Sequence, residues 1–296
     1  MGNVGAVFLF EWKRALTGPR ILWWAVLAAF PIFIVGLIRY NAVLEPETET
    51  DRVEVHGREL TTRLPSNRFR RAVPQLKMRA KSDLWRALCA WLIFALVPML
   101  VSMLGTLLWT TPAISTELER RSWIYLSVRP NGGAAVLLGK YLAAVSWVIL
   151  PALVSLSIAV PLANTGDSFR IWWTMVRLVL LSTPAYAAIY LLIGVLMPRR
   201  AMVLAVAYTL IFELMISFVP AVINKITVQY RLRSLAAEWC DLSFTEGSPT
   251  AAMTLIGTEP VWQHIAVLIC LTLVLVFGSI ALLRSSEFSS AIESDS

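Results

Sequence analysis

One short part of the chain concentrates charged and aromatic side chains between two long apolar stretches. It reads Glu-Leu-Glu-Arg-Arg-Ser-Trp-Ile-Tyr over 117–125, and Pro130-Asn-Gly-Gly follows a few residues later. Glu117 and Arg121 are four residues apart, so they can pair on one face of a helix. Such groups gain nothing from a bilayer but suit a groove on a soluble partner. The pattern indicates either a short docking helix outside the membrane or an ordinary charged loop.

Glu213 is a second candidate, because it lies near the middle of the apolar stretch 201–224. A carboxylate at mid-membrane costs at least about 2.5–3.5 kcal/mol, so it normally faces protein or water. In one interpretation Glu213 contacts a substrate or a proton in a transport path. In the other it is a structural acid near a dimer interface, neutral or bonded to a neighbouring helix. We favour the structural interpretation.

Other sequence patterns argue against catalysis by this chain. The stretch from Gly133 to Gly139-Lys140 resembles a phosphate-binding loop, but its spacing is one residue too long and Tyr141 replaces the required Ser or Thr. Three cysteines (Cys89, Cys240 and Cys270) and two histidines (His56 and His264) give no metal-ligand spacing and no disulfide framework. No apolar stretch holds an Asp and no H-E-x-x-H motif occurs, so an intramembrane protease is not expected.

The composition places the chain in a membrane. Of its 296 residues, 57% are hydrophobic and 15% are charged, against roughly 25% charged residues in soluble domains. The mean hydropathy is +0.68. The net charge of +7 is explained by basic residues that flank membrane spans and meet anionic head groups, rather than by nucleic-acid binding.

Six apolar stretches are each long enough to cross a bilayer as a helix. A basic amphipathic helix over 4–17 precedes them, with Phe8, Leu9, Trp12 and Leu16 on one side, and we expect it to lie in the membrane interface. Lys140 marks a span boundary, and we expect its ammonium to reach the interface. The predicted spans are 21–38, 87–116, 141–166, 178–198, 201–224 and 261–283.

The predicted fold is therefore an all-α membrane protein of six transmembrane helices with both termini on one side. It divides into an elbow helix at 1–19, a six-span domain at 20–284 and a disordered tail at 285–296. Long extracytoplasmic loops are predicted at 39–86 and 225–260. The positive-inside rule does not fix the orientation, because the loop 39–86 alone has eleven Lys and Arg residues against ten on the terminal face.

The segment 117–140 also carries a resemblance to a known family. It reads Glu117-x-Glu119, Ser122, Trp123-Ile-Tyr125-Leu, Pro130 and then Gly139-Lys140-Tyr-Leu-Ala before a span. This order resembles the permease subunits of type-2 ABC transporters, and the N-terminal Phe10-Glu-Trp-Lys-Arg followed by Thr17-Gly-Pro-Arg resembles their elbow helix. The family often has Gly-Thr where Arg121-Ser122 stands here, so the docking contacts can differ.

The resemblance implies a permease that exports an unidentified substrate, powered by a separate ATPase subunit. Two copies of that subunit would bind ATP and magnesium, and this chain would bind no cofactor itself. It also implies a homodimer in a bacterial inner membrane with cytoplasmic termini. The implied contacts with the ATPase come from the cytoplasmic coupling segment 117–140: Glu117, Glu119, Arg121, Trp123, Tyr125 and Pro130.

Two other functions stay open from the sequence. An ATP-independent secondary transporter would usually show internal repeats or interrupted helices with polar centres. The sequence has no clear repeat, and Glu213 is the one charged residue inside a predicted span. A membrane assembly factor is the third possibility.

Overall fold

The fold is helical throughout the part of the chain that the computed structural model describes, which is residues 2–16, 20–44, 83–119, 132–219, 222–241 and 259–293. Within a bilayer only helices or closed barrels satisfy every backbone N–H and C=O group, and these ranges contain no strand. The helices are α1 (Gly2–Ala15), α2 (Arg20–Leu44), α4 (Ser102–Glu119), α6 (Gly132–Ala163), α7 (Ser168–Leu196), α8 (Ala201–Tyr208), α9 (Val228–Trp239) and α11 (Val261–Glu293).

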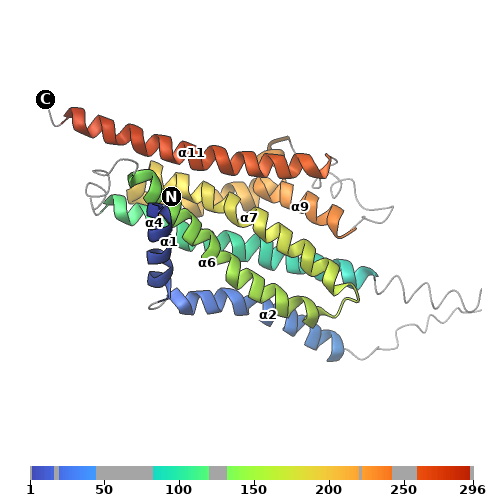
Figure 1. The fold of residues 1–296 in the computed structure, drawn as a ribbon. Coiled ribbons are helices and arrows are strands. Elements are labelled where there is room, and N and C mark those ends of the chain that lie inside the picture. Colours follow the sequence, from blue (N-terminus) through green and yellow to red (C-terminus); the bar gives the residue numbers. More distant parts are fainter. Residues whose placement is uncertain are drawn as a thin grey trace, which may run out of the picture.

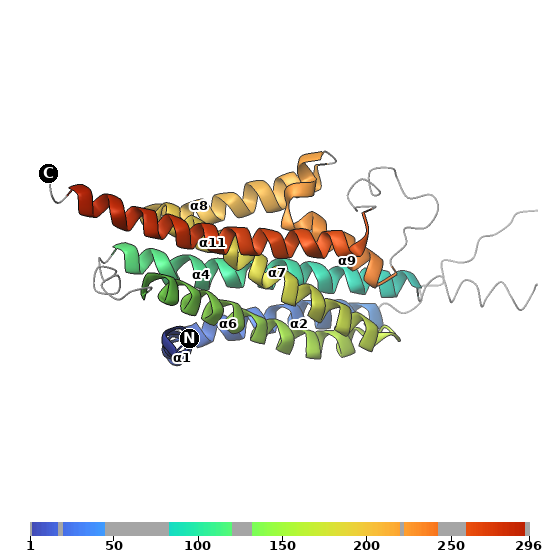
Figure 2. The same cartoon turned by 45° about the horizontal axis from the view of Figure 1, so that its top comes forward.

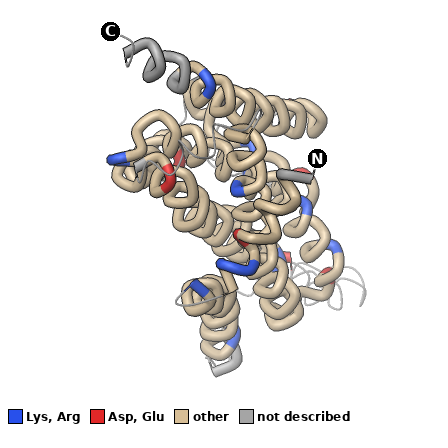
Figure 3. The backbone as a smooth tube through the Cα atoms, turned by 60° about the vertical axis from the view of Figure 1, so that its left-hand side comes forward, with Lys and Arg blue, Asp and Glu red and all other residues tan. Residues whose placement is uncertain are grey.

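Five helices in the described ranges are long and apolar enough to cross a membrane. They are Arg20–Asn41, Asp83–Leu118, Gly132–Ala163, Ser168–Leu196 and Val261–Ser285. The second includes a π-helical turn, η1 (Ala95–Val101), which contains Pro98. Most of the coloured tube in Figure 3 is tan, the colour of residues other than Lys, Arg, Asp and Glu. The prediction of a multi-pass, all-α membrane protein is thus confirmed, and five spans are seen as uninterrupted helices.

The predicted span 201–224 is not one continuous helix. After α8 the chain passes into the π-helix η3 (Thr209–Met215) and the short 3-10 helix η4 (Ile216–Phe218). Val219 is extended, with φ −82° and ψ 123°, and Pro220 follows it in the sequence. A proline disfavours helical backbone in the residue before it. This stretch therefore ends as a helix before the predicted boundary at residue 224.

Helix α9 occupies part of the predicted loop 225–260. The 3-10 helix η5 (Val222–Ile226) leads into it, and Thr227 caps its N-terminus by accepting a hydrogen bond from Tyr230 N at 3.3 Å. Helix α9 packs against α7 and α11, and residues 228–237 are buried. The first part of this predicted loop is therefore a packed helix.

The ends of the long helices fall into two groups at opposite ends of the bundle (Figure 1). One end holds α1, the end of α4, the beginning of α6 and the C-terminal part of α11. The other end holds the end of α2, the turn between α6 and α7, and the beginning of α11. Helix α11 runs to Glu293, so most of the tail predicted to be disordered at 285–296 continues the helix.

Helix α7 forms the centre of the bundle, and α2 and α11 lie at its edges. In the most apolar part of each helix, 67% of the α7 residues are buried, compared with 22% of the α2 residues and 17% of the α11 residues. Small polar residues allow α4 and α7 to approach closely: Thr183 Oγ1 donates to Ser102 Oγ at 3.3 Å, and both side chains are fully buried. The apolar outer faces of α2 and α11 require lipid or another apolar surface.

Candidate functional site

Helix α1 lies across the direction of the long helices, at the end of the bundle (Figures 1 and 2). It packs closely on α6, because a Cβ added at Gly139 would come within 2.8 Å of the Val7 side chain. Leu9 and Leu16, on the predicted apolar side, are 60% and 51% exposed. Glu11, predicted on the polar side, is on the packed face because it pairs with a cation of α6.

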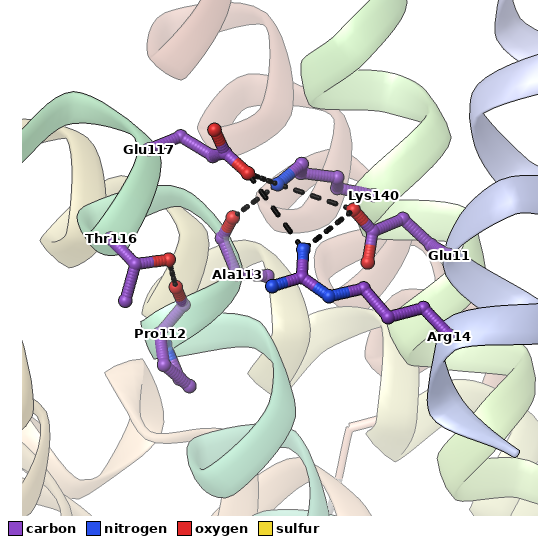
Figure 4. Close-up of polar contacts among 7 residues, drawn as sticks. All are labelled: Glu11, Arg14, Pro112, Ala113, Thr116, Glu117 and Lys140. Carbon is purple, nitrogen blue, oxygen red and sulfur yellow. Dashed lines mark hydrogen bonds and ion pairs between the residues drawn. The ribbon is translucent and has the colours of Figure 1, made fainter. Parts of the chain in front are cut away.

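That cation is Lys140, whose side chain is only 6% exposed. Its Nζ atom lies 2.9 Å from Glu117 Oε1 and 3.3 Å from Glu11 Oε1, and it donates to the Ala113 carbonyl oxygen at 2.8 Å (Figure 4). Arg14 Nη1 lies 3.9 Å from Glu11 Oε1 and 4.0 Å from Glu117 Oε1. We call Glu11, Arg14, Glu117 and Lys140 the Lys140 cluster.

The Lys140 cluster joins three helices at one point. Glu117 is near the end of α4, Lys140 is in the first part of α6, and Glu11 and Arg14 are on α1 (Figure 4). Glu117 and Lys140 are also the first and last residues of the predicted coupling segment. Both ends of that segment are therefore tied together and to α1.

One sequence prediction about this region changes. The sequence places the Lys140 ammonium at the interface, but the ammonium is buried because two carboxylates and a carbonyl oxygen replace water around it. Glu117 forms an ion pair with Lys140, and its pairing with Arg121 stays a prediction because Arg121 lies outside the described residues. The contacts of Lys140 do not follow from local spacing, since Glu11, Glu117 and Lys140 are far apart in the sequence.

The other predicted coupling residues fall mostly outside the described part of the chain. Arg121, Trp123, Tyr125 and Pro130 lie outside the described residues, and for Glu119 the description gives only its backbone, the last residue of α4. Their role stays a prediction. The stretch from Gly133 to Lys140 lies entirely within α6. Its backbone N–H groups are thus part of a helix rather than of a phosphate-binding loop.

Glu213 is fully buried in η3, where its carboxylate accepts hydrogen bonds from several donors. Tyr208 Oη donates to Oε1 at 2.9 Å, and Tyr186 Oη donates to Oε2 at 3.4 Å. The backbone N–H groups of Val228 and Gln229 donate at 3.3 and 3.1 Å. These two residues form the first turn of α9, so Glu213 satisfies donors that a helix N-terminus otherwise leaves unpaired.

This arrangement favours the structural interpretation of Glu213. The carboxylate ties η3 to α9, and Gln229 Nε2 extends the network by donating to Tyr186 Oη at 2.7 Å. Arg233, on α9, donates to the Ser217 carbonyl oxygen and thus links α9 to η4. A role of Glu213 in a transport path stays a prediction.

The sequence did not predict a polar network around α9. Glu259 lies 2.7 Å from Lys225 Nζ and accepts a hydrogen bond from Tyr230 Oη at 3.2 Å. His264 is fully buried, and its Nδ1 lies 3.2 Å from Arg231 Nη1. The pattern Val228, Leu232, Leu235 and Ala236, with helical spacing, could have indicated a helix here. The high polar content of the segment is typical of a loop and favours that prediction over a helix.

The ion pair of Lys225 and Glu259 shifts the pKa values of both side chains. The hydrogen bond from Lys225 lowers the pKa of Glu259 below its ordinary value. The same contact raises the pKa of Lys225. Both shifts favour the charged forms, so this contact holds η5 to the beginning of α11 over the neutral pH range.

Two further findings bear on the chemistry. In the described ranges, no group of three or more His, Cys, Asp and Glu side chains is arranged to hold a metal ion. No protein family, curated protein or solved structure compared with this chain matches it.

Proposed function

We propose that this chain is the membrane-spanning subunit of an ATP-driven exporter of the type-2 ABC kind, with ATP hydrolysed by a separate subunit. The observation that carries the proposal is the Lys140 cluster. A segment that receives force from a partner must be firmly attached to the helices that it moves. The ion pair of Glu117 and Lys140 at the two ends of 117–140, together with Glu11 on α1, supplies such an attachment.

The position and composition of α1 add support. A helix that lies across the end of the bundle and exposes Leu9, Phe10 and Leu16 suits the membrane interface. Because Glu11 ties this helix to the coupling segment, motion of the segment would also shift α1 against the lipid. In this proposal six crossings place both termini and 117–140 in the cytoplasm, and two copies of the chain form the exporter.

Partner capture tests the proposal. Affinity-tagged chain would be purified from membrane extracts beside a variant with Trp123→Ala and Tyr125→Ala. A matched control would carry Phe169→Ala and Trp173→Ala, which remove exposed aromatic side chains from the opposite end of the bundle. We expect a nucleotide-hydrolysing subunit with the wild type and the control, and loss of it with the segment variant. Equal recovery from all three, or none from any, contradicts the proposal.

Sidedness provides an independent test. Single cysteines at Ser127 and Ser66 would be introduced into a chain whose three native cysteines are replaced. In intact cells a membrane-impermeant maleimide should label position 66 and spare position 127 until the cells are opened. Labelling of position 127 in intact cells would place the segment on the wrong side for an ATPase.

A secondary transporter is the second candidate, because one observation favours it. The fifth apolar stretch is interrupted at Val219, and the Glu213 carboxylate lies at the N-terminus of α9, a combination typical of transporter sites with broken helices. This candidate requires no ATPase partner. It also predicts that the purified chain alone, in liposomes, dissipates a proton or sodium gradient and that Glu213→Gln abolishes this leak.

A further inference from the structure

A cavity of about 680 Å³ lies beside the Lys140 cluster, between α1, α2, α4 and α6. Its volume is in the range of roughly 300–1,000 Å³ that small-molecule sites occupy. Four indole rings contribute to its wall, from Trp12 of α1, Trp23 of α2, Trp109 of α4 and Trp147 of α6. Tryptophan is enriched at membrane interfaces, because its ring is apolar and its N–H can meet water or head groups.

The charged side chains that line the cavity, counted over the described residues, sum to one positive charge. Arg14, Arg20 and Lys140 line it together with two carboxylates, Glu11 and Glu117. Lys140 contacts both carboxylates directly. Arg20 is the first residue of α2, and its side chain is exposed beside the cavity. The local field therefore favours an anionic group close to Arg20.

A separate observation indicates that a ligand with oxygen atoms belongs here. Trp147 is 5% exposed, and within the described ranges its Nε1–H has no hydrogen-bond acceptor. A buried indole N–H usually finds one. The neighbouring Trp12 does, since its Nε1 donates to Ser146 Oγ at 2.8 Å. Trp147 also lines the cavity, so a ligand with phosphate or ester oxygens would lie beside an indole N–H that lacks an acceptor among the described residues.

We propose that this cavity binds one anionic phospholipid, with the phosphate near Arg20 and the beginning of the acyl chains against Trp23 and Trp109. Basic pockets between membrane helices are known to accept anionic head groups. A free phosphate would leave the aromatic wall uncovered, and a zwitterionic lipid would not use the excess charge. Because α1 and the Lys140 cluster form part of the wall, the lipid would hold α1 against α4 and α6. This site does not depend on any ATPase partner.

Native mass spectrometry of the full-length chain in detergent tests the proposal. The probes are dioleoyl phosphatidylglycerol, dioleoyl phosphatidylcholine and inorganic phosphate as a competitor. The test variants are Arg20→Gln, which removes the excess charge, and Thr116→Trp, which fills the cavity from an exposed position in its wall. The matched control is Arg39→Gln, which removes the same charge from the other half of α2.

We expect the wild type and Arg39→Gln to retain one phosphatidylglycerol in preference to phosphatidylcholine. Arg20→Gln should weaken phosphatidylglycerol binding about tenfold, as for the loss of one charge-assisted contact. Thr116→Trp should abolish this binding, and the unfolding temperature of this variant should stay near that of the wild type. Equal binding by the Arg20 and Arg39 variants would overturn the proposal. So would equal retention of the two lipids, or displacement of the lipid by inorganic phosphate.

Discussion

Removal of the carboxylates around Lys140 gives the sharpest prediction. Glu11→Gln or Glu117→Gln alone leaves one carboxylate and the Ala113 carbonyl oxygen in contact with Nζ. Each should cost about 1–2 kcal/mol, because a hydrogen bond to a charged group is weakened rather than lost. The double variant leaves a buried ammonium without either anion, and such charges cost about 3–5 kcal/mol.

The losses of stability should therefore be non-additive, and a third substitution should reverse most of the combined loss. The double variant should lose more stability than the two single variants together. Lys140→Met, added to the double variant, should recover most of the loss, since replacement of a whole buried ion cluster by apolar groups is often close to neutral.

The assay is the thermal unfolding of the purified chain in one detergent, followed by tryptophan fluorescence. For domains of about 150–250 residues, 1 kcal/mol corresponds to about 2–4 °C. Asp167→Asn is the control, because Asp167 pairs with Arg86 at the surface and should cost less than about 1 kcal/mol. Additive losses without rescue by Lys140→Met would refute the reasoning and indicate that the Lys140 ammonium reaches water.

Three further predictions follow from the contacts around α1 and α9. Gly139→Ala should cost about 1–3 kcal/mol by pushing Val7 of α1 away from α6, whereas Gly5→Ala, with open space around it, should not lower the unfolding temperature. Glu213→Gln should lower that temperature by the equivalent of about 1–3 kcal/mol, because an amide cannot accept from all the donors that face the carboxylate; an unchanged temperature would count against the structural role. The lowered pKa of Glu259 means that its ion pair with Lys225 stabilises the fold above the ordinary carboxyl pKa and that this contribution is lost as pH falls through the lowered value. The unfolding temperature should therefore fall less steeply below about pH 4.5 in Lys225→Gln than in the wild type. An equally steep fall in both would exclude the Lys225–Glu259 contact as the cause of the fall.

The sequence predicted the long helices well, because an apolar stretch in a bilayer has few alternatives to a helix. Five of the six predicted stretches appear as continuous helices. The remaining stretch, 201–224, does not, because average hydropathy does not reveal that its helix ends before Val219. Pro220 was the available indication, since it disfavours helical backbone at Val219.

The sequence predicted only those parts of the site that depend on residues close together in the chain. Glu117 and Lys140 stood out as the ends of a charged segment between two spans. Their mutual contact, and that of Lys140 with Glu11, depends on how α1, α4 and α6 pack, which local spacing does not encode. The buried helix α9 was missed for a related reason. Its Arg231 and Arg233 suggested exposure to solvent, but partners on other elements make their burial possible.

Site-specific photo-crosslinking in living cells tests the central claim most directly. A photoreactive amino acid would replace Trp123, in the coupling segment, or Phe169, which is exposed at the opposite end of the bundle. Our account predicts that the probe at position 123 forms an adduct with a nucleotide-hydrolysing subunit and that the probe at position 169 does not. Adducts at position 123 only with lipid or with proteins outside the cytoplasm would contradict it.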